Sequence, residues 1–241
     1  MTARAPHLRP DRLLATLDKL QARIDARFPS AGLARVCADV TETARFSARD
    51  AADLARPRPA WRLAALALIV LGVAAQVAAF RFLQVRTDAL TAPELVQGLE
   101  AAVNLLILFG GAIWFLLTLE ERMKRRRALD ALHRLRSLAH VIDMHQLTKD
   151  PTVVLDQHKT PASPERTMTQ FELTRYLDYC AEMLSLIGKL AALYGDRTRD
   201  SVVIAAVNDI EDLTAGLGRK IWQKITLIGV LEERPPPASA N

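Results

Sequence analysis

The sequence predicts an all-α membrane protein, in which a two-span transmembrane hairpin carries a cytosolic helical bundle and the second span continues as a long helix into the cytosol. Two apolar runs, residues 61–80 and 101–119, are long enough to cross a bilayer. Lysines and arginines crowd beside these runs, as they do at cytoplasmic membrane surfaces. Apolar residues recur at helical spacing over most of the remaining chain. A soluble protein with two buried core helices is the rival interpretation, and the charges that flank both runs disfavour it.

The long helix is expected to run from Thr91 to Asp150. It begins at Thr91-Ala92-Pro93-Glu94, where a Thr N-cap is followed by a Pro that suits the first helical turn. Residues 101–119 carry no charge. At about 1.5 Å per residue they cover roughly 30 Å, the thickness of the hydrocarbon core. Apolar residues then recur at steps of three and four, so residues 120–150 are expected to extend the helix into the cytosol.

The basic residues predict the orientation in the membrane. The connection between the spans, residues 81–100, is expected outside and both termini in the cytoplasm, because the basic residues crowd at the opposite ends of the spans. Nucleic-acid binding is not expected, since no aromatic residues are interleaved with the arginines. The richness in alanine and arginine indicates a bacterial chain and therefore an inner membrane. The expected membrane-surface anchors are Arg58, Trp61, Arg62, Lys124, Arg125, Arg126 and Arg127.

The remaining segments are expected to form the bundle and its connections. The N-terminal residues 1–60 predict two cytosolic amphipathic helices, the second with Leu33, Val36, Val40 and Phe46 facing inward. Residues 151–169 contain three prolines and predict a loop, residues 170–230 an antiparallel helix pair, and residues 231–241 a disordered tail.

The helix pair carries two apolar seams that must be buried. They pack either on other helices of the same chain or between the subunits of a homo-oligomer, in the manner of a coiled coil. The seam residues are Leu173, Leu177, Cys180, Leu184, Ile187, Ile210, Leu217 and Ile221.

Two amides stand out within the predicted spans. Gln76 and Asn104 both lie near the external end, because the first span runs outward and the second inward. They are expected to hydrogen-bond to each other, within one chain or between subunits. The alternative is that they line a pore or a ligand cavity.

Few residues suggest chemistry. His140, Asp143 and Met144 lie on one helical turn and are weak candidates for a metal site, which generally needs three or four convergent ligands. The polar stretch Asp143–Pro151 is expected to terminate the long helix rather than to act in function. Cys180 is expected to be a buried hydrophobic residue, and a disulfide with Cys37 is not expected. No phosphate loop, nucleophile elbow or zinc-binding helix occurs in the sequence, so no catalytic residue, cofactor or enzymatic activity is predicted.

Three classes of function are compatible with this organisation. The first is a membrane-anchored interaction or assembly protein, whose cytosolic bundle associates with itself or with a cytosolic protein. The second is an oligomeric channel or membrane-perturbing effector with a sensing bundle. The third, and weakest, is an enzyme that uses the His140–His145 region.

Overall fold

The structure is a computed structural model that describes residues 7–29, 31–54, 59–84, 92–149 and 168–232. All regular elements in these ranges are α-helices, which confirms the predicted all-helical class. The chain divides into two compact units, Met1–Ala55 with Arg127–Asn241 and Arg56–Arg126, which we call the bundle and the hairpin. The helices are α1 (Pro10–Arg27), α2 (Gly32–Leu54), α3 (Pro59–Gln84), α4 (Ala92–Leu147), α5 (Gln170–Gly195) and α6 (Ser201–Glu232).

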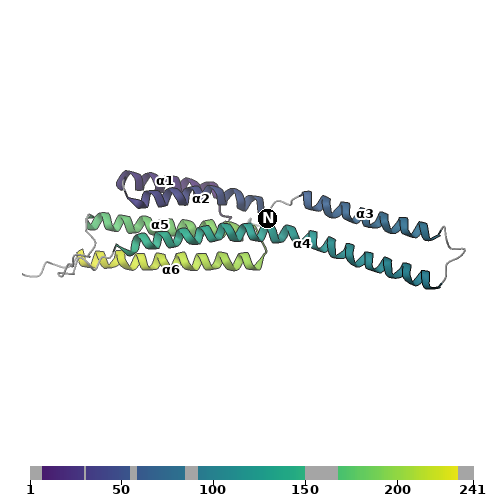
Figure 1. The fold of residues 1–241 in the computed structure, drawn as a ribbon. Coiled ribbons are helices and arrows are strands. Elements are labelled where there is room, and N and C mark those ends of the chain that lie inside the picture. The colour runs from purple at the N-terminus through teal and green to yellow at the C-terminus, as the bar shows by residue number, and fades with distance from the viewer. Residues whose placement is uncertain (1–6, 30, 55–58, 85–91, 150–167, 233–241) are drawn as a thin grey trace, which may run out of the picture. The chain divides into compact units, whose positions relative to one another are not determined.

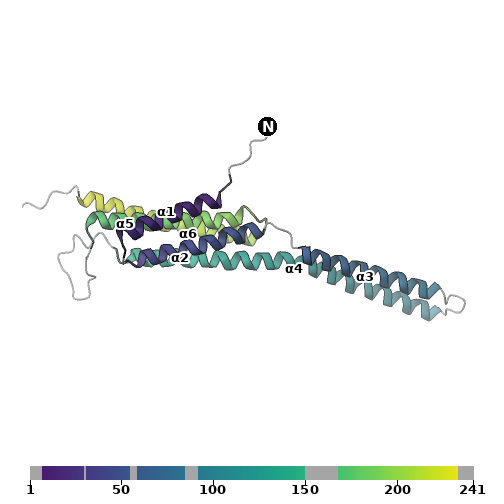
Figure 2. The same cartoon turned by 90° about the horizontal axis from the view of Figure 1, so that it is seen from above.

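The bundle contains α1, α2, α5, α6 and the part of α4 that begins at Arg127. Helix α5 contacts α6 on one side and α1 and α2 on the other, while α1 also packs on α2 (Figures 1 and 2). A single core cluster draws buried side chains from all five helices, so the hydrophobic faces of the bundle meet within one chain.

Helix α5 is the centre of this bundle. The predicted seam along it is buried, apart from Leu173, which is partly buried at its start. A second stripe is buried as well, because other helices cover α5 on more than one side. This second stripe consists of Tyr176, Tyr179, Met183, Leu186, Leu190 and Leu193. The seam residues of α6, namely Ile210, Leu217 and Ile221, also lie in the core.

Helix ends in the bundle are fixed by local hydrogen bonds. Thr169 and Glu172 form a reciprocal capping box at the start of α5, the arrangement that satisfies free N–H groups of a first turn. The Asp200 carboxylate accepts hydrogen bonds from the N–H groups of Val202 and Val203 at 3.0 and 3.3 Å, which caps α6.

Phe46 does not face inward as the sequence predicts. Its side chain is 47% exposed, and its ring lies under the guanidinium of Arg134, 4.7 Å from ring centroid to Cζ. The buried face of α2 continues from Val40 through Ala44 and Ser47 instead. Phe46 lies one residue away from that face, so its ring covers a neighbouring surface rather than the core.

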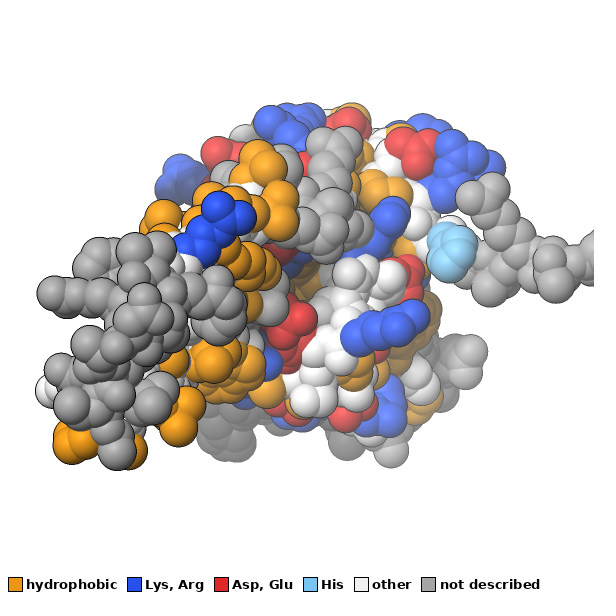
Figure 3. Space-filling view, turned by 90° about the vertical axis from the view of Figure 1, so that its right-hand side faces the viewer, with side chains coloured by type: hydrophobic (Ala, Val, Ile, Leu, Met, Phe, Trp, Pro, Cys, Tyr) orange, Lys and Arg blue, Asp and Glu red, His pale blue; other side chains and the backbone are white. Residues whose placement is uncertain are grey.

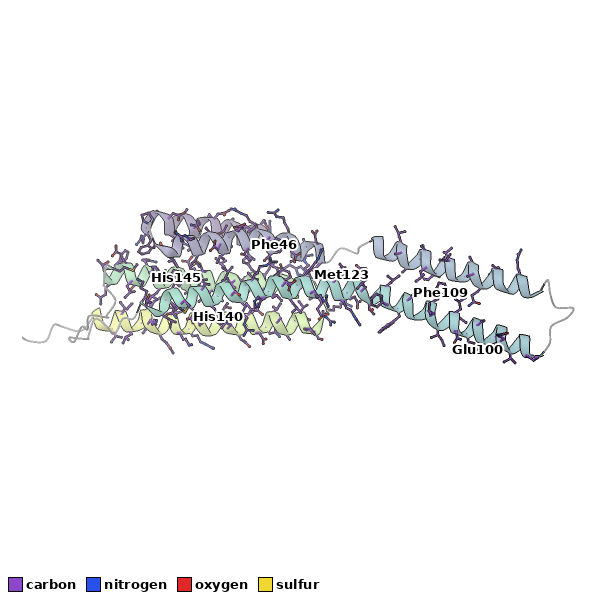
Figure 4. All side chains as sticks on the ribbon, viewed as in Figure 1. Phe46, Glu100, Phe109, Met123, His140 and His145 are labelled. Carbon is purple, nitrogen blue, oxygen red and sulfur yellow. The ribbon has the colours of Figure 1, made fainter. Side chains whose placement is uncertain are left out.

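The hairpin consists of α3 and the part of α4 that ends at Arg126, two antiparallel helices (Figure 1). They approach closely at Gly72, where an added Cβ would lie 3.2 Å from Cδ1 of Phe109, the residue marked in Figure 4. Most of the large apolar side chains that the structure describes in the hairpin are exposed, and Figure 3 shows hydrophobic side chains gathered on the surface of this unit. The hairpin therefore exposes large apolar side chains, whereas the bundle buries its apolar seams in a core.

One described helix, α4, is long and apolar enough to cross a membrane, and the apolar part of its sequence is not buried. The corresponding segment of α3, Leu63–Ala78, is shorter. Several predictions fall on residues outside the described ranges. These are the greater part of the loop 151–169, residues 233–241 of the tail, residues 85–91 of the external connection, and Arg58.

Candidate functional site

The end of α1, the start of α2, the end of α4 and the start of α5 meet at one end of the bundle. A cavity of about 450 Å³ lies between them, and we call it the end cavity. His145, Thr148 and Lys149 in its lining belong to the polar stretch that is predicted to terminate the long helix. Its polar lining comprises Arg27, His145, Thr148, Lys149, Glu172 and Tyr176.

Phe28 fixes the α1 side of the end cavity. The backbone N–H of Phe28 donates to the carbonyl of Ile24 at 2.7 Å and so closes α1. The ring is 8% exposed and meets the rings of Tyr176 and Tyr179 edge to face, with centroid distances of 5.7 and 6.3 Å. Such aromatic pairs add to the stability that burial alone provides. The end of α1 is thereby held on α5.

Tyr176 and His145 join α5 to α4 at the cavity. The Tyr176 hydroxyl lies 3.4 Å from Nδ1 of His145, which belongs to the side of α4 that faces α5 (Figure 4). Burial raises the pKa of Tyr176, so the phenol stays protonated. Gly32 makes room for the imidazole, because a Cβ at residue 32 would lie only 2.8 Å from Cε1 of His145.

Two cations border the cavity. The Arg27 guanidinium lies 5.2 Å from the centroid of the Phe171 ring, and the Lys149 ammonium lies 5.4 Å from that of Tyr176. The Glu172 carboxylate accepts hydrogen bonds from the N–H and the hydroxyl of Thr169, at 2.8 and 2.9 Å. The bond from the Thr169 N–H is the main cause of the lowered pKa of Glu172. Glu172 is therefore ionised and engaged in capping α5.

The residue after His145 ties α4 to α6. Gln146 is 2% exposed, and its backbone carbonyl and Oε1 accept hydrogen bonds from Lys224 Nζ at 3.0 and 2.7 Å. Its Nε2 donates to Asp143 at 2.5 Å. The backbone N–H of Lys149 also donates to the Gln146 carbonyl at 3.1 Å. The stretch predicted to terminate α4 therefore also connects this helix to its neighbours.

The candidate metal ligands do not converge. His140 and Met144 are exposed, and Asp143 accepts the hydrogen bond from Gln146. Within the described ranges, no group of three or more His, Cys, Asp or Glu side chains has an arrangement suited to a metal ion. Among the described residues, no ligand from another helix completes the weak candidate site at His140, Asp143 and Met144.

Neither cysteine is placed for nucleophilic chemistry. Cys37 and Cys180 are free thiols in the core of the bundle. Burial raises the pKa of each thiol to about 12, so the reactive thiolate is scarce at neutral pH.

The amides of the predicted spans lie at comparable heights in the hairpin. The contact between Gly72 and Phe109 sets the register of the antiparallel helices, and it places Asn104 within about one helical turn of the level of Gln76. Gln76 is half-buried, whereas Asn104 is exposed. Their hydrogen bond therefore stays a prediction.

The predicted surface anchors are only partly described. Lys124 pairs with Glu120 at 2.8 Å, and Arg125, Arg126 and Arg127 are exposed. Trp61 and Arg62 belong to α3, and their side chains lie outside the described part of the structure.

Arg27, Gly32 and Tyr176 are site residues that the sequence did not predict. Arg27 and Gly32 are more than 100 positions from His145 and Lys149, and Tyr176 is 31 positions from His145. Helical spacing predicts only which residues share a face of one helix. The predicted helix break at Phe28–Gly32 was a sequence feature that pointed to this end of the bundle, because turns commonly carry functional residues. Comparison of the chain with known protein families, with curated proteins and with solved structures finds no match.

Proposed function

We propose that this chain is a membrane-anchored helical interaction protein, with the hairpin in the bilayer and the bundle available to a cytosolic partner or to a second copy of the chain. The observation that carries the proposal is the contrast between the two units. The bundle buries its apolar seams within the chain, whereas the hairpin leaves large apolar side chains exposed.

The exposed residues of the hairpin would gain substantially from lipid. Val96, Leu99, Leu106, Ile107 and Leu108 are each between 65% and 71% exposed, and α3 adds Leu63, Leu71 and Val73 at about 60%. Removing one such side chain from water contributes roughly 1.5–3 kcal/mol. Together with the other exposed apolar residues of α3 and α4, the sum is on the order of 20 kcal/mol, which favours a bilayer over an aqueous surround.

The distribution of basic residues supports an orientation with both termini in the cytoplasm, and we place the chain in a bacterial inner membrane on composition. The exposed arginines at 125–127 suit a cytoplasmic membrane surface. In this arrangement the bundle faces the cytosol and is accessible to soluble proteins.

Two measurements test the anchor and its orientation. The protein is expected to stay with membranes after washing with alkaline carbonate, and release into the supernatant would refute the anchor. In a variant without the native cysteines, Asp88→Cys should react with a membrane-impermeant maleimide in intact cells, whereas Arg199→Cys should react only after lysis. The reverse pattern would overturn the orientation.

The mass of the nanodisc-held protein, with lipid subtracted, tests the mode of interaction. A defined oligomer supports self-association, and a monomer supports an adaptor that binds a different cytosolic protein. A broad, concentration-dependent mixture of masses would contradict a specific assembly.

A second candidate function is an oligomeric channel or membrane-perturbing effector. Asn104 favours it, because its amide is exposed on an otherwise apolar helix, where a polar group needs a hydrogen-bonding partner or water. We expect Asn104→Leu and Gln76→Leu to change ion flux through liposomes that contain the protein. Unchanged flux in both variants, relative to the wild type, would exclude a pore lined by these amides.

A further inference from the structure

Among the described residues, the lining of the end cavity contains two cations, Arg27 and Lys149, and one carboxylate, Glu172, and therefore an excess of positive charge. Arg27 and Lys149 come from different helices, and neither forms an ion pair with any residue that the structure describes. The carboxylate in the lining, Glu172, accepts hydrogen bonds from Thr169, and Arg27 also contributes to its lowered pKa, so Glu172 offsets part of the positive charge. Because the two cations lie beside one concave surface, the local potential there favours an anion.

The donors around the cavity suit a phosphate group. A guanidinium presents a planar fork of N–H donors, and an ammonium adds a compact charge that rotates freely. The hydroxyl of Thr148 and the protonated phenol of Tyr176 add uncharged donors from α5 and from the end of α4. Phosphate, with several acceptor oxygens, uses donors that converge from different directions in this way.

The size of the cavity indicates more than a bare ion. A volume of about 450 Å³ falls within the range of roughly 300–1,000 Å³ that is usual for small-molecule sites. Phe28 and Met168 contribute apolar surface to the lining. An organic part of the ligand would contact these two side chains.

We propose that the end cavity binds a small phosphorylated molecule from the cytosol, with its phosphate group between Arg27 and Lys149. A membrane lipid presents the same chemistry, but distance argues against it. His145 lies roughly 27 Å beyond Arg127 along α4, at about 1.5 Å per residue. If the basic residues around Arg127 lie at the membrane surface, a lipid headgroup does not reach the cavity.

The test uses the full-length protein in nanodiscs of phosphatidylcholine, titrated with phenyl phosphate and with inorganic phosphate by calorimetry at constant ionic strength. Thr148→Glu and Thr148→Gln form a matched pair, since they differ in charge and scarcely in size. Thr148 is exposed, so both variants are expected to fold. We expect Thr148→Glu to weaken phenyl phosphate binding at least tenfold and Thr148→Gln to change it less than threefold.

The two cations provide an independent arm. Arg27→Gln and Lys149→Gln should each weaken phenyl phosphate binding about tenfold, because each removes a charge-assisted interaction. Lys19→Gln removes one positive charge from the exposed surface of α1, away from the cavity, and should leave the affinity unchanged. Protection of the native cysteines from thiol reagents verifies that each variant is folded.

Three results would overturn the proposal. The first is no binding of either phosphate probe to the wild type at millimolar concentration. The second is equal binding by Thr148→Glu and Thr148→Gln. The third is a loss of phenyl phosphate binding on adding anionic lipid to the nanodiscs, which would assign the site to lipid headgroups. The binding assay does not depend on the topology of the hairpin, so its failure leaves the anchor proposal intact.

Discussion

The hydrogen bonds between Lys224 and Gln146 make the stability of the bundle depend on one lysine. Replacing Lys224 with methionine keeps a side chain of similar length and removes the two hydrogen bonds that Lys224 donates to Gln146. The Gln146 backbone carbonyl retains the N–H of Lys149, but Gln146 Oε1 is left without this donor in a side chain that is 2% exposed. A buried acceptor without its partner costs about 1–3 kcal/mol, so we expect a loss of about 2 kcal/mol.

The native cysteines give a readout that is confined to the bundle. The 241-residue sequence contains two cysteines, and both are fully buried in the bundle core. A thiol reagent therefore labels them only when the bundle opens, and the unfolding of the hairpin or changes in the detergent do not produce a signal. When reclosing is faster than labelling, the labelling rate follows the free energy of opening. A loss of about 2 kcal/mol corresponds to labelling roughly 30-fold faster.

Lys220→Met is the matched control, because Lys220 is exposed and lies one turn earlier on the same helix. It should label at nearly the wild-type rate. In the double variant Lys224→Met/Gln146→Met both partners are apolar, so part of the loss should be recovered. If Lys224→Met labelled no faster than Lys220→Met, the reasoning from buried hydrogen bonds would be wrong.

Two further predictions concern the bundle core. In Gly188→Ala the new Cβ would lie 2.8 Å from Thr214 Oγ1, so overpacking should lower the free energy of unfolding by about 1–3 kcal/mol. Adding Thr214→Ala should restore part of this loss. Equal stability of Gly188→Ala and of the double variant Gly188→Ala/Thr214→Ala in urea titrations would contradict this contact. Burial raises the pKa of the Cys37 and Cys180 thiols to about 12, above their usual pKa near 9, and the protonated form is therefore favoured in the folded state. This contribution to stability is complete below about pH 9 and is lost as the pH rises towards 12, so urea midpoints should fall over that interval, and by less when both cysteines are replaced by alanine.

The helical class could be predicted from the sequence because each helix carries its own signals. Spacing and turn residues report local backbone preferences, and these do not depend on which helix lies beside which. The sequence did not predict how many sides of α5 are buried. The sequence shows one regular seam, while Tyr176, Tyr179 and Met183 are buried on other sides of the same helix. Whether such residues face solvent or a neighbour depends on the tertiary arrangement, which periodicity along one helix does not contain.

Phe46 illustrates the opposite error. A large aromatic residue near the end of an apolar stripe suggests a core position, yet Ala44 and Ser47 occupy the buried face and Phe46 packs against Arg134. The pairing of His145, in the polar stretch noted from the sequence, with Tyr176 was not predicted, for a related reason. The Tyr176 hydroxyl and His145 Nδ1 lie 3.4 Å apart only because the fold brings α5 beside the end of α4. Neither residue belongs to a sequence motif that would predict this contact.

The burial of the seams changes how self-association should be tested. The sequence left open whether the seam through Leu184 packs within one chain or between subunits, and Leu184→Asp would then appear to be a test of oligomerisation. In the structure Leu184 is fully buried inside the bundle. A carboxylate there would unfold the bundle, and a loss of oligomeric mass would report misfolding.

Trp222, which is 57% exposed on α6, is the better choice, because Trp222→Ser removes apolar surface without disturbing the core. If the bundles associate through α6, this variant dissociates the oligomer while the cysteines stay protected. If the mass is unchanged, the contact lies on another face or in the hairpin.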